Sequence, residues 1–246
     1  MCRSSVTLRL MIGACLLCGI SLRAAPDYST YARLLQTYVA EDGVRYEAWA
    51  KHARDVGALG AVVAELGQAD LAALSTGEQK ALYINLYNAA MLQVVFEHYP
   101  IKSVKEIGLL PFSVFKQKFI SLGGKQVSLN AVEKEILLKQ YFDPRIHFAV
   151  NCASGSCPPL RAEPYVGERL KVQLNEQTRL FAESDRAAQV DTKEKETAYS
   201  ELFKWYADDF DVKSPAEFLN RYREENLPVH HSVQWIDYDW SLNQAK

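Results

Sequence analysis

The pattern of hydrophobic and polar positions predicts a chain made mainly of helices. Apolar residues recur with helical spacing in four segments, at residues 28–39, 56–66, 166–182 and 200–210. A longer helical run follows Ser75, where Glu78 completes the spacing of a capping box. This run extends to about Tyr99, and Pro100 ends it. Because the run is apolar nearly all round, we expect it to be a central, buried helix.

Two further helices have recognisable starts. Asn130 can cap one, with Glu133 at the position where a capping-box carboxylate stands. Ser214 precedes Pro215, which suits the first turn of a helix because its missing N–H costs nothing there. Glu133 is therefore open to two interpretations, a helix-capping residue or a carboxylate of a functional site.

Short alternating runs around turn residues predict three β-hairpins. The clearest covers residues 119–128, with Gly123-Gly124 at the turn, and the others lie at residues 39–49 and 188–199. Strands and helices do not alternate as βαβ units, so the fold class that we expect is α+β: a helix-rich single domain with short antiparallel hairpins. It would cover residues 25–246.

The first residues follow a different pattern, that of a secretory signal peptide. Arg3 and Arg9 precede an apolar run over residues 10–22 that is shorter than a membrane span. We expect residues 1–24 to be removed and the protein to be exported, either periplasmic or secreted, with no stable membrane span after processing. The alternatives are a retained anchor or lipidation at Cys15.

Composition and charge narrow the classes of function. The 246 residues carry 28 basic and 30 acidic side chains, a formal net charge of −2. Proteins that bind nucleic acids usually carry an excess of basic side chains to contact the phosphates. This chain has no such excess, so we expect no nucleic-acid partner. There is no GxGxxG, no GxxxxGK[ST] and no HExxH motif. We therefore predict no cofactor and no metal, and the expected ligand is a small molecule or a peptide.

Two amides interrupt the apolar helix after Ser75. Asn85 and Asn88 are three residues apart and so share one face. A buried amide needs hydrogen-bond partners. Either the two side chains hold neighbouring loop backbone, or they line a polar site in which an asparagine orients a catalytic imidazole.

The densest polar segment is residues 143–159. Residues 146–150 are expected to form a short buried strand, followed by a tight loop of small residues between Cys152 and Cys157. If the strand continued, His147 and Cys152 would face opposite sides, so a dyad requires a turn at about Asn151. The polar side chains in and around this segment are candidate binding residues: Asn151, Ser154, Glu133 and Arg145.

Three chemistries compete for this segment. Cys152 could be a thiolate nucleophile activated by His147, with loop N–H groups as an oxyanion hole. Cys152 and Cys157 are the two cysteines left after removal of the leader, and they could instead form a disulfide in an oxidising compartment. A metal site of His147 and the two thiols is the third possibility.

The residues resemble a known family, called domain of unknown function 547. The resemblance covers residues 71–210 and rests on YINLYN from Tyr83, VEKEIL from Val132, DPRIHFAVNC from Asp143, and KWY with Asp209-Phe210. The closing YDWSLN from Tyr238 is similar to bacterial exported members. The resemblance itself implies no defined activity.

The chain departs from the family pattern at two positions. Lys134 stands where the family typically has histidine, which puts in doubt any mechanism that needs a second imidazole. The family often has serine at the position of Cys157, which implies that a disulfide is not a shared requirement. The resemblance thus favours His147 and Cys152 as the site.

Two hypotheses on function follow. The first is a cysteine-dependent hydrolase or acyl transferase with Cys152 as nucleophile, His147 as base, and Asn88 or Asn85 as the residue that orients the imidazole. The second is a non-enzymatic envelope binding or scaffold domain with a structural Cys152–Cys157 disulfide.

Overall fold

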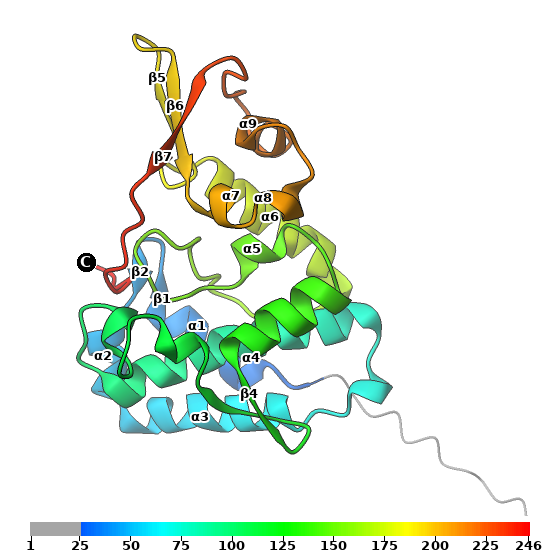
Figure 1. The fold of residues 1–246 in the computed structure, drawn as a ribbon. Helices are drawn as coiled ribbons and strands as arrows, with labels where there is room; N and C mark the ends of the chain where they lie inside the picture. Colours follow the sequence, from blue (N-terminus) through cyan, green and yellow to red (C-terminus); the bar gives the residue numbers. More distant parts are fainter. Residues whose placement is uncertain (1–25) are drawn as a thin grey trace, which may run out of the picture.

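The computed structural model describes residues 26–246, and the predicted leader over residues 1–24 lies outside this range. The lower part of the molecule in Figure 1 is mainly helical, with α4 in its middle and α3 below. Its helices are α1 (Ser29–Tyr38), α2 (Tyr46–Ala50), α3 (Ala53–Gly67), η1 (Leu71–Ala73), α4 (Thr76–His98), η2 (Val104–Glu106), η3 (Ser113–Phe115) and η4 (Ala131–Leu138).

The upper part contains a three-stranded sheet and short helices (Figure 1). Its elements are α7 (Leu202–Trp205), α8 (Ala207–Phe210), α9 (Pro215–Leu219), β5 (Ala188–Asp191), β6 (Glu196–Ser200) and β7 (Ser232–Ile236). Between the two parts lie α5 (Ile146–Ala149), η5 (Gly167–Arg169) and α6 (Leu170–Ala182). The molecule is therefore the helix-rich α+β fold that the sequence predicts.

The central helix α4 forms as its sequence predicts. The Ser75 hydroxyl accepts a hydrogen bond from the Glu78 N–H at 3.3 Å, and the Glu78 carboxylate accepts the Ser75 N–H at 2.7 Å. This capping box satisfies two exposed backbone donors at the start of the helix. The helix ends at His98, two residues before Pro100. Its middle, residues 81–92, is buried without interruption.

All three predicted hairpins are present. They are β1 (Val39–Ala40) with β2 (Gly43–Val44), β3 (Lys118–Leu122) with β4 (Lys125–Ser128), and β5 with β6. The first is much shorter than expected, because the chain enters α2 at Tyr46 instead of continuing as a strand. The sheet also gains β7, which pairs in parallel with β6 and was not predicted.

The predicted strand over residues 146–150 is wrong, since Ile146–Ala149 forms α5. The Asp143 carboxylate accepts the Arg145 N–H at 3.1 Å, and the Asp143 carbonyl accepts the Ile146 N–H at 3.0 Å. These bonds turn the chain into a helix before the apolar run begins. All four residues of α5 are buried. A short apolar run is compatible with a buried strand and with a buried helix, so periodicity could not separate the two.

Two other helices also differ from expectation. Residues 131–138 (η4) have the hydrogen-bond spacing of a π-helix, a rare form that often marks functional sites. Asn130 does not cap it, because the Ser128 hydroxyl accepts the Ala131 N–H at 3.2 Å instead. The predicted helix at residues 200–210 breaks at Tyr206, between α7 and α8.

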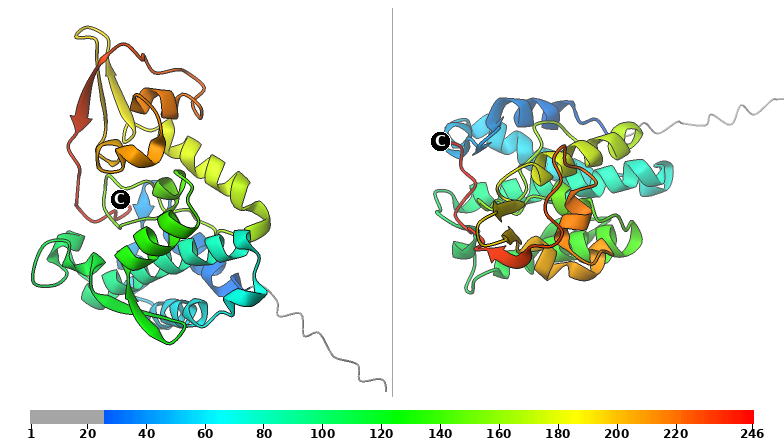
Figure 2. Two further views of the ribbon diagram at one scale, coloured as in Figure 1. Left: turned by 45° about the vertical axis from the view of Figure 1, so that its right-hand side comes forward. Right: turned by 90° about the horizontal axis from the view of Figure 1, so that it is seen from above.

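The hydrophobic core has two clusters that meet at α5. Ile146 and Ala149 pack into the larger cluster around α4, whereas Phe148 packs into a second cluster with Phe181, Phe203 and other aromatic rings. Figure 1 and the left view of Figure 2 place α5 and α6 between the two parts of the molecule. One short helix therefore contributes side chains to both cores.

The C-terminal segment, residues 237–246, joins distant parts of the chain. It forms β-bridges with Val44, Ser103 and Ser154, and the chain ends beside β1 and β2 (Figure 1). Gly43 allows this approach, because a Cβ there would stand 2.4 Å from the Asn243 carbonyl oxygen. The segment therefore lies against the loop between Cys152 and Cys157.

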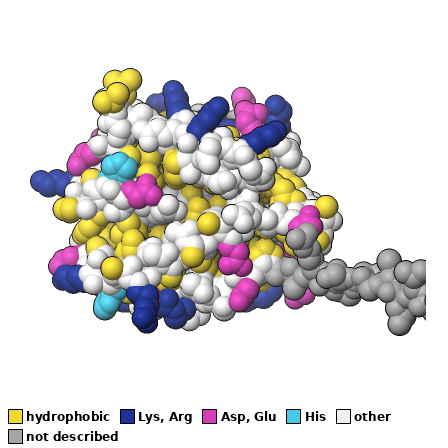
Figure 3. Space-filling model, turned by 90° about the horizontal axis from the view of Figure 1, so that it is seen from below, with side chains coloured by type: hydrophobic (Ala, Val, Ile, Leu, Met, Phe, Trp, Pro, Cys, Tyr) yellow, Lys and Arg dark blue, Asp and Glu magenta, His cyan; other side chains and the backbone are white. Residues whose placement is uncertain are grey.

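The described surface has mixed charge and no membrane-spanning element. On the face seen from below, basic and acidic side chains alternate around the rim and hydrophobic side chains show between them (Figure 3). Within residues 26–246, no helix is both long and apolar enough to cross a bilayer.

Candidate functional site

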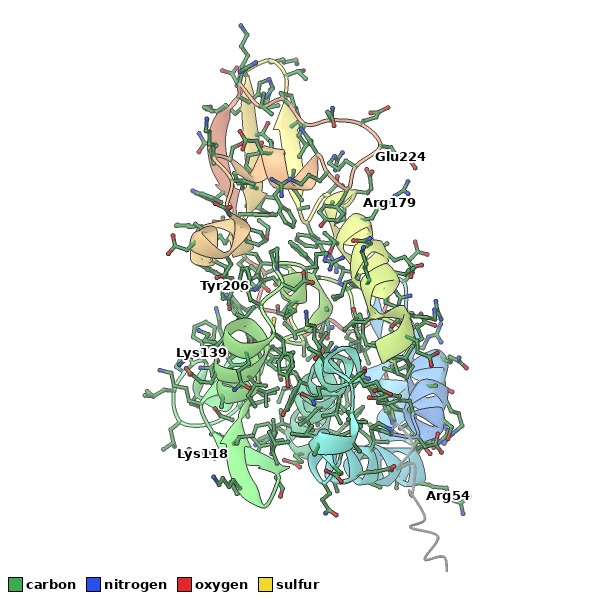
Figure 4. All side chains as sticks on the ribbon, turned by 90° about the vertical axis from the view of Figure 1, so that its right-hand side faces the viewer. Arg54, Lys118, Lys139, Arg179, Tyr206 and Glu224 are labelled. Carbon is green, nitrogen blue, oxygen red and sulfur yellow. The ribbon has the colours of Figure 1, made fainter. Side chains whose placement is uncertain are left out.

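A pocket of about 240 Å³ lies where the two hydrophobic clusters meet. Figure 4 places Tyr206, one of its lining residues, between the sheet above and the helices below. The walls are mostly apolar and aromatic, which is typical of a small-molecule site. The aromatic lining residues are Tyr87, Phe112, Phe115, Trp205, Tyr206, Tyr238 and Trp240; the polar and charged ones include Lys116, Asn130, Glu133, Lys134, His147 and Cys152.

The Cys152 thiol is a partly exposed group of this pocket. Its sulfur lies 2.9 Å from the Ser154 hydroxyl and 3.4 Å from the Tyr238 hydroxyl. The Cys152 N–H donates to the Cys157 sulfur at 3.0 Å. Both cysteines are free thiols, and they do not form the disulfide considered from the sequence.

This setting lowers the pKa of Cys152 to about 7. The hydrogen bond with the Cys157 thiol is the largest cause, the Ser154 and Tyr238 hydroxyls add to it, and burial opposes it. Burial raises the pKa of Cys157 well above its usual range. Of the two thiols, that of Cys152 is therefore the one that ionises first, and a thiolate is the reactive form of cysteine.

The loop around Cys152 is held by a buried amide. Asn151 accepts the Ala153 N–H at 2.9 Å and donates to the Pro158 carbonyl at 2.8 Å. Asn243 donates to the same Asn151 oxygen at 3.2 Å. Asn151 is therefore buried in the support of the loop and does not line the pocket, while its neighbour Ser154 contacts the thiol.

The expected oxyanion hole of loop N–H groups is not present. Ala153 donates to Asn151, Ser154 to the Cys152 sulfur, Gly155 to Ser241, Ser156 to Asp239 and Cys157 to Ser154. The N–H groups of Cys152 and Ser154 are the ones that donate to sulfur, a weak acceptor. A developing negative charge would have to use these N–H groups or side-chain donors.

His147 lines the same pocket but is paired with a carboxylate. Its Nε2 lies 2.8 Å from an Asp209 oxygen, and its ring centroid is 4.1 Å from that of Tyr206. Burial lowers the pKa of His147, although the hydrogen bond to Asp209 acts in the opposite direction. Among the hydrogen bonds of residues 26–246, none joins His147 to Cys152. The two side chains share the pocket without forming a contact dyad.

Glu133 belongs to the pocket and is not a helix cap. It is buried, and its carboxylate accepts a hydrogen bond from the Tyr206 hydroxyl at 2.9 Å. Of the two interpretations made from the sequence, a carboxylate at the site agrees with this placement.

The side-chain amides of Asn85 and Asn88 in α4 form hydrogen bonds with backbone groups of other segments. Asn88 donates to the Ala149 carbonyl at 2.9 Å and accepts the Asn151 N–H at 2.8 Å. Asn85 forms an equivalent pair of bonds with the backbone of Tyr165, at 2.7 and 2.9 Å. Neither amide forms a hydrogen bond with His147. Asn88 fixes the end of α5 and the start of the Cys152 loop, so it acts on the site only through backbone.

Arg145 lies away from the pocket. Its guanidinium bonds to Asp143 at 2.6 Å and to Asn175 at 2.6 Å, on the side of α6. Its role is to fix the start of α5. Within the described range, no three His, Cys, Asp or Glu side chains gather closely enough to hold a metal ion.

Several residues of the site were missed from the sequence. Asp209 belongs to the segments that carry the family resemblance but was not a site candidate, yet it is the hydrogen-bond partner of His147. Tyr238 and Trp240 lie more than 80 residues from Cys152 along the chain, so no local pattern could bring them together. The aromatic composition of the closing YDW string was the available signal.

Comparison with known proteins supports the family resemblance for part of the chain. The model of the family described as "Protein of unknown function, DUF547" matches residues 71–182. This range contains Glu133, His147 and Cys152, whereas Asp209 and Tyr238 lie beyond it. No curated protein and no solved structure matches the chain.

Proposed function

We propose that this protein is a cysteine-dependent hydrolase or acyl transferase that acts in the pocket around Cys152. The observation that carries the proposal is the setting of the thiol. Cys152 faces a pocket of small-molecule size, and its sulfur is surrounded by the Ser154 hydroxyl, the Tyr238 hydroxyl and the Cys157 thiol. These groups stabilise a thiolate without a neighbouring imidazole.

In the acylation step, the Cys152 sulfur attacks the carbonyl carbon of an ester, amide or thioester. A carbon–sulfur bond forms, the bond to the leaving group breaks, and the leaving group takes up a proton from solvent water. With a pKa of about 7, a substantial fraction of Cys152 is already ionised at neutral pH. Deprotonation of the thiol by His147 is then not required.

His147 can act as the base in the second step, in which the acyl group is removed from Cys152. Its pKa is lowered, so the imidazole is neutral at pH 7 and can accept a proton. With Nε2 hydrogen bonded to Asp209, Nδ1 is the nitrogen free to act as the base. In this proposal His147 takes a proton from water or an acceptor amine as it attacks the thioester, and the thiolate leaves.

The test is acylation measured by intact mass. The protein is incubated with p-nitrophenyl esters, peptide p-nitroanilides and acyl thioesters, and the expected result is a single acyl adduct on Cys152. Iodoacetamide labelling should be half-maximal near pH 7. The Cys152→Ala variant should lose both the adduct and the label.

Cys157→Ala is the matched control. It should keep labelling at Cys152 but shift it to higher pH, because the Cys157 thiol is the largest cause of the lowered pKa. An inert Cys152, or labelling that begins only above pH 8.5 as for an ordinary cysteine, would contradict the proposal.

Export is also part of our proposal. It is supported by the arginines, the apolar run and the small residues before Pro26 in the sequence. The mass of the protein recovered from the periplasm or medium should correspond to cleavage after Ala24. Recovery only of uncleaved chain inside the cell would contradict export.

A further inference from the structure

A hydrophobic loop projects from the molecule beside the pocket. Figure 2 shows the segment between α4 and β3 extending from one side of the molecule. Its tip is residues 108–112, which we call the docking loop. Leu109 is 100% exposed and Leu110 is 70% exposed, and Phe112 is 37% exposed while lining the pocket. Adjacent exposed leucines are costly in water unless a partner covers them.

The docking loop is held in shape. Ile107, directly before the loop, and Val114, two residues after its end, are completely buried. The Ser113 hydroxyl donates to the Ile107 carbonyl at 3.1 Å, and the Ser113 N–H donates to the Leu110 carbonyl at 3.1 Å. Phe112 has a φ of 66°, a strained conformation for a residue other than glycine. The exposure of the two leucines is therefore imposed by an ordered backbone.

Positive charge surrounds the loop. The Lys105 ammonium stands 5.3 Å from the ring centroids of both Phe112 and Trp240, and Lys116 lines the pocket next to them. Between Lys102 and Lys118 the chain carries four lysines and one acidic residue, Glu106. This local excess of positive charge contrasts with the formal net charge of −2 for the whole chain.

Aromatic side chains complete this surface. Phe112 packs edge-on against Trp240 at 4.6 Å between ring centroids, and Trp205 stacks on Trp240 at 6.0 Å. Trp205 is 44% exposed. Tryptophan favours the interface between water and lipid, where its ring is partly apolar and its N–H can stay hydrated.

We propose that the docking loop inserts into the surface of an anionic lipid bilayer. Leu109 and Leu110 would enter the boundary between headgroups and acyl chains, while Lys105 and Lys116 contact anionic headgroups. In a symmetric dimer formed through this loop the same lysines of two copies would face each other, and this like-charge contact favours an anionic bilayer over a second copy. The mouth of the pocket, which shares Phe112 and Trp240 with this surface, then faces the membrane. This binding does not depend on the chemistry of Cys152.

Co-flotation with vesicles tests the proposal. The protein spanning residues 25–246 is mixed with vesicles of phosphatidylcholine, and separately with vesicles of equal parts phosphatidylcholine and phosphatidylglycerol. We expect reversible binding to the anionic vesicles that weakens at high salt. Leu109→Ser with Leu110→Ser should weaken it about tenfold or more. Lys105→Gln with Lys116→Gln should also weaken it.

The matched control is the double variant Val172→Ser with Leu180→Ser on α6. These two side chains are 52% and 54% exposed, respectively. The control removes two exposed apolar side chains elsewhere on the surface and should leave vesicle binding unchanged. Absence of binding to anionic vesicles, or an equal loss in the control, would overturn the proposal. Self-association of the parent that disappears in the leucine variant would also overturn it, because a second copy would then occupy the surface.

Discussion

His147 shows how burial can outweigh a neighbouring charge at one residue. An aspartate at 2.8 Å would ordinarily raise the pKa of an imidazole, yet the pKa of His147 is lowered. The ring is enclosed by α5, Tyr206 and Phe210, so the loss of hydration of the charged form is the larger effect. The residue types alone therefore do not predict whether the pKa of His147 is raised or lowered.

Stability should therefore depend on the protonation of His147. The unfolded chain, with a histidine pKa near 6.5, binds the proton more readily than the folded protein does. The stabilising contribution is present above pH 6.5 and is lost as pH falls from 6.5 through the lowered pKa. We expect His147→Gln to flatten the fall in the free energy of unfolding below pH 6.5, measured by urea titration at several pH values.

The exposed His230→Gln variant is the control for this measurement. It should keep the pH dependence of the parent protein. If His147→Gln also kept it, burial of His147 would not be the cause of that part of the acid sensitivity.

At the scale of elements, Asn151 connects α5, the Cys152 loop and the C-terminal segment. Replacing it by alanine leaves the Ala153 N–H and the Pro158 carbonyl without partners in a buried setting. We expect Asn151→Ala to lower the free energy of unfolding by about 2 kcal/mol, measured by urea unfolding. The exposed Asn226→Ala should change it by less than about 0.5 kcal/mol.

Iodoacetamide labelling of the same Asn151 variant reports on the site. Because the loop positions Ser154 and Cys157 around the sulfur, we expect labelling of Cys152 to shift to higher pH. An unchanged pH profile would show that the thiol keeps its surroundings without Asn151.

The sequence predicts elements well where the signal is local. The capping box at Ser75 and the paired glycines at the turn of β3 and β4 act within a few residues, and both form as expected. The form of α5 was missed because its four residues are buried on every side. The break at Tyr206 was missed because it serves contacts to Glu133 and His147, more than 50 residues away.

The same contrast applies to the site. Cys152, His147 and Glu133 were found from residue type and from the family resemblance, and they do line one pocket. Of the two interpretations of Asn85 and Asn88, hydrogen bonding to loop backbone agrees with the structure, but which backbone they bind was not visible from their spacing. The roles of Asp209 and Tyr238 could be recognised only in the folded chain.

At the scale of the whole molecule, residues 237–246 hold the N-terminal hairpin and the Cys152 loop together. Asn243 accepts a hydrogen bond from the buried Tyr46 hydroxyl at 2.9 Å and donates to Asn151. We expect truncation after Ile236 to lower the free energy of unfolding by about 3 kcal/mol or more, because several buried polar groups lose partners. Urea unfolding of the truncated chain measures this.

The less disruptive variant Tyr238→Phe separates stability from chemistry. It removes one hydroxyl near the Cys152 sulfur and keeps the aromatic packing on Trp205 and Trp240. Labelling of Cys152 should move to higher pH, with little change in the free energy of unfolding.

For the truncation after Ile236, a truncated chain as stable as the parent protein would contradict the stabilising role of residues 237–246.

The contact of Tyr238 with the Cys152 sulfur also means that the surroundings of the thiol are completed late in biosynthesis. The ribosome adds residues 237–246 after all the rest of the described chain. Until they emerge and reach the loop, Cys152 lacks the Tyr238 hydroxyl, and Asn151 lacks the amide of Asn243. Of the groups that lower the pKa of Cys152, Cys157 and Ser154 are therefore synthesised early, whereas Tyr238 joins them last. The surroundings of the thiol are complete only when synthesis has passed this segment.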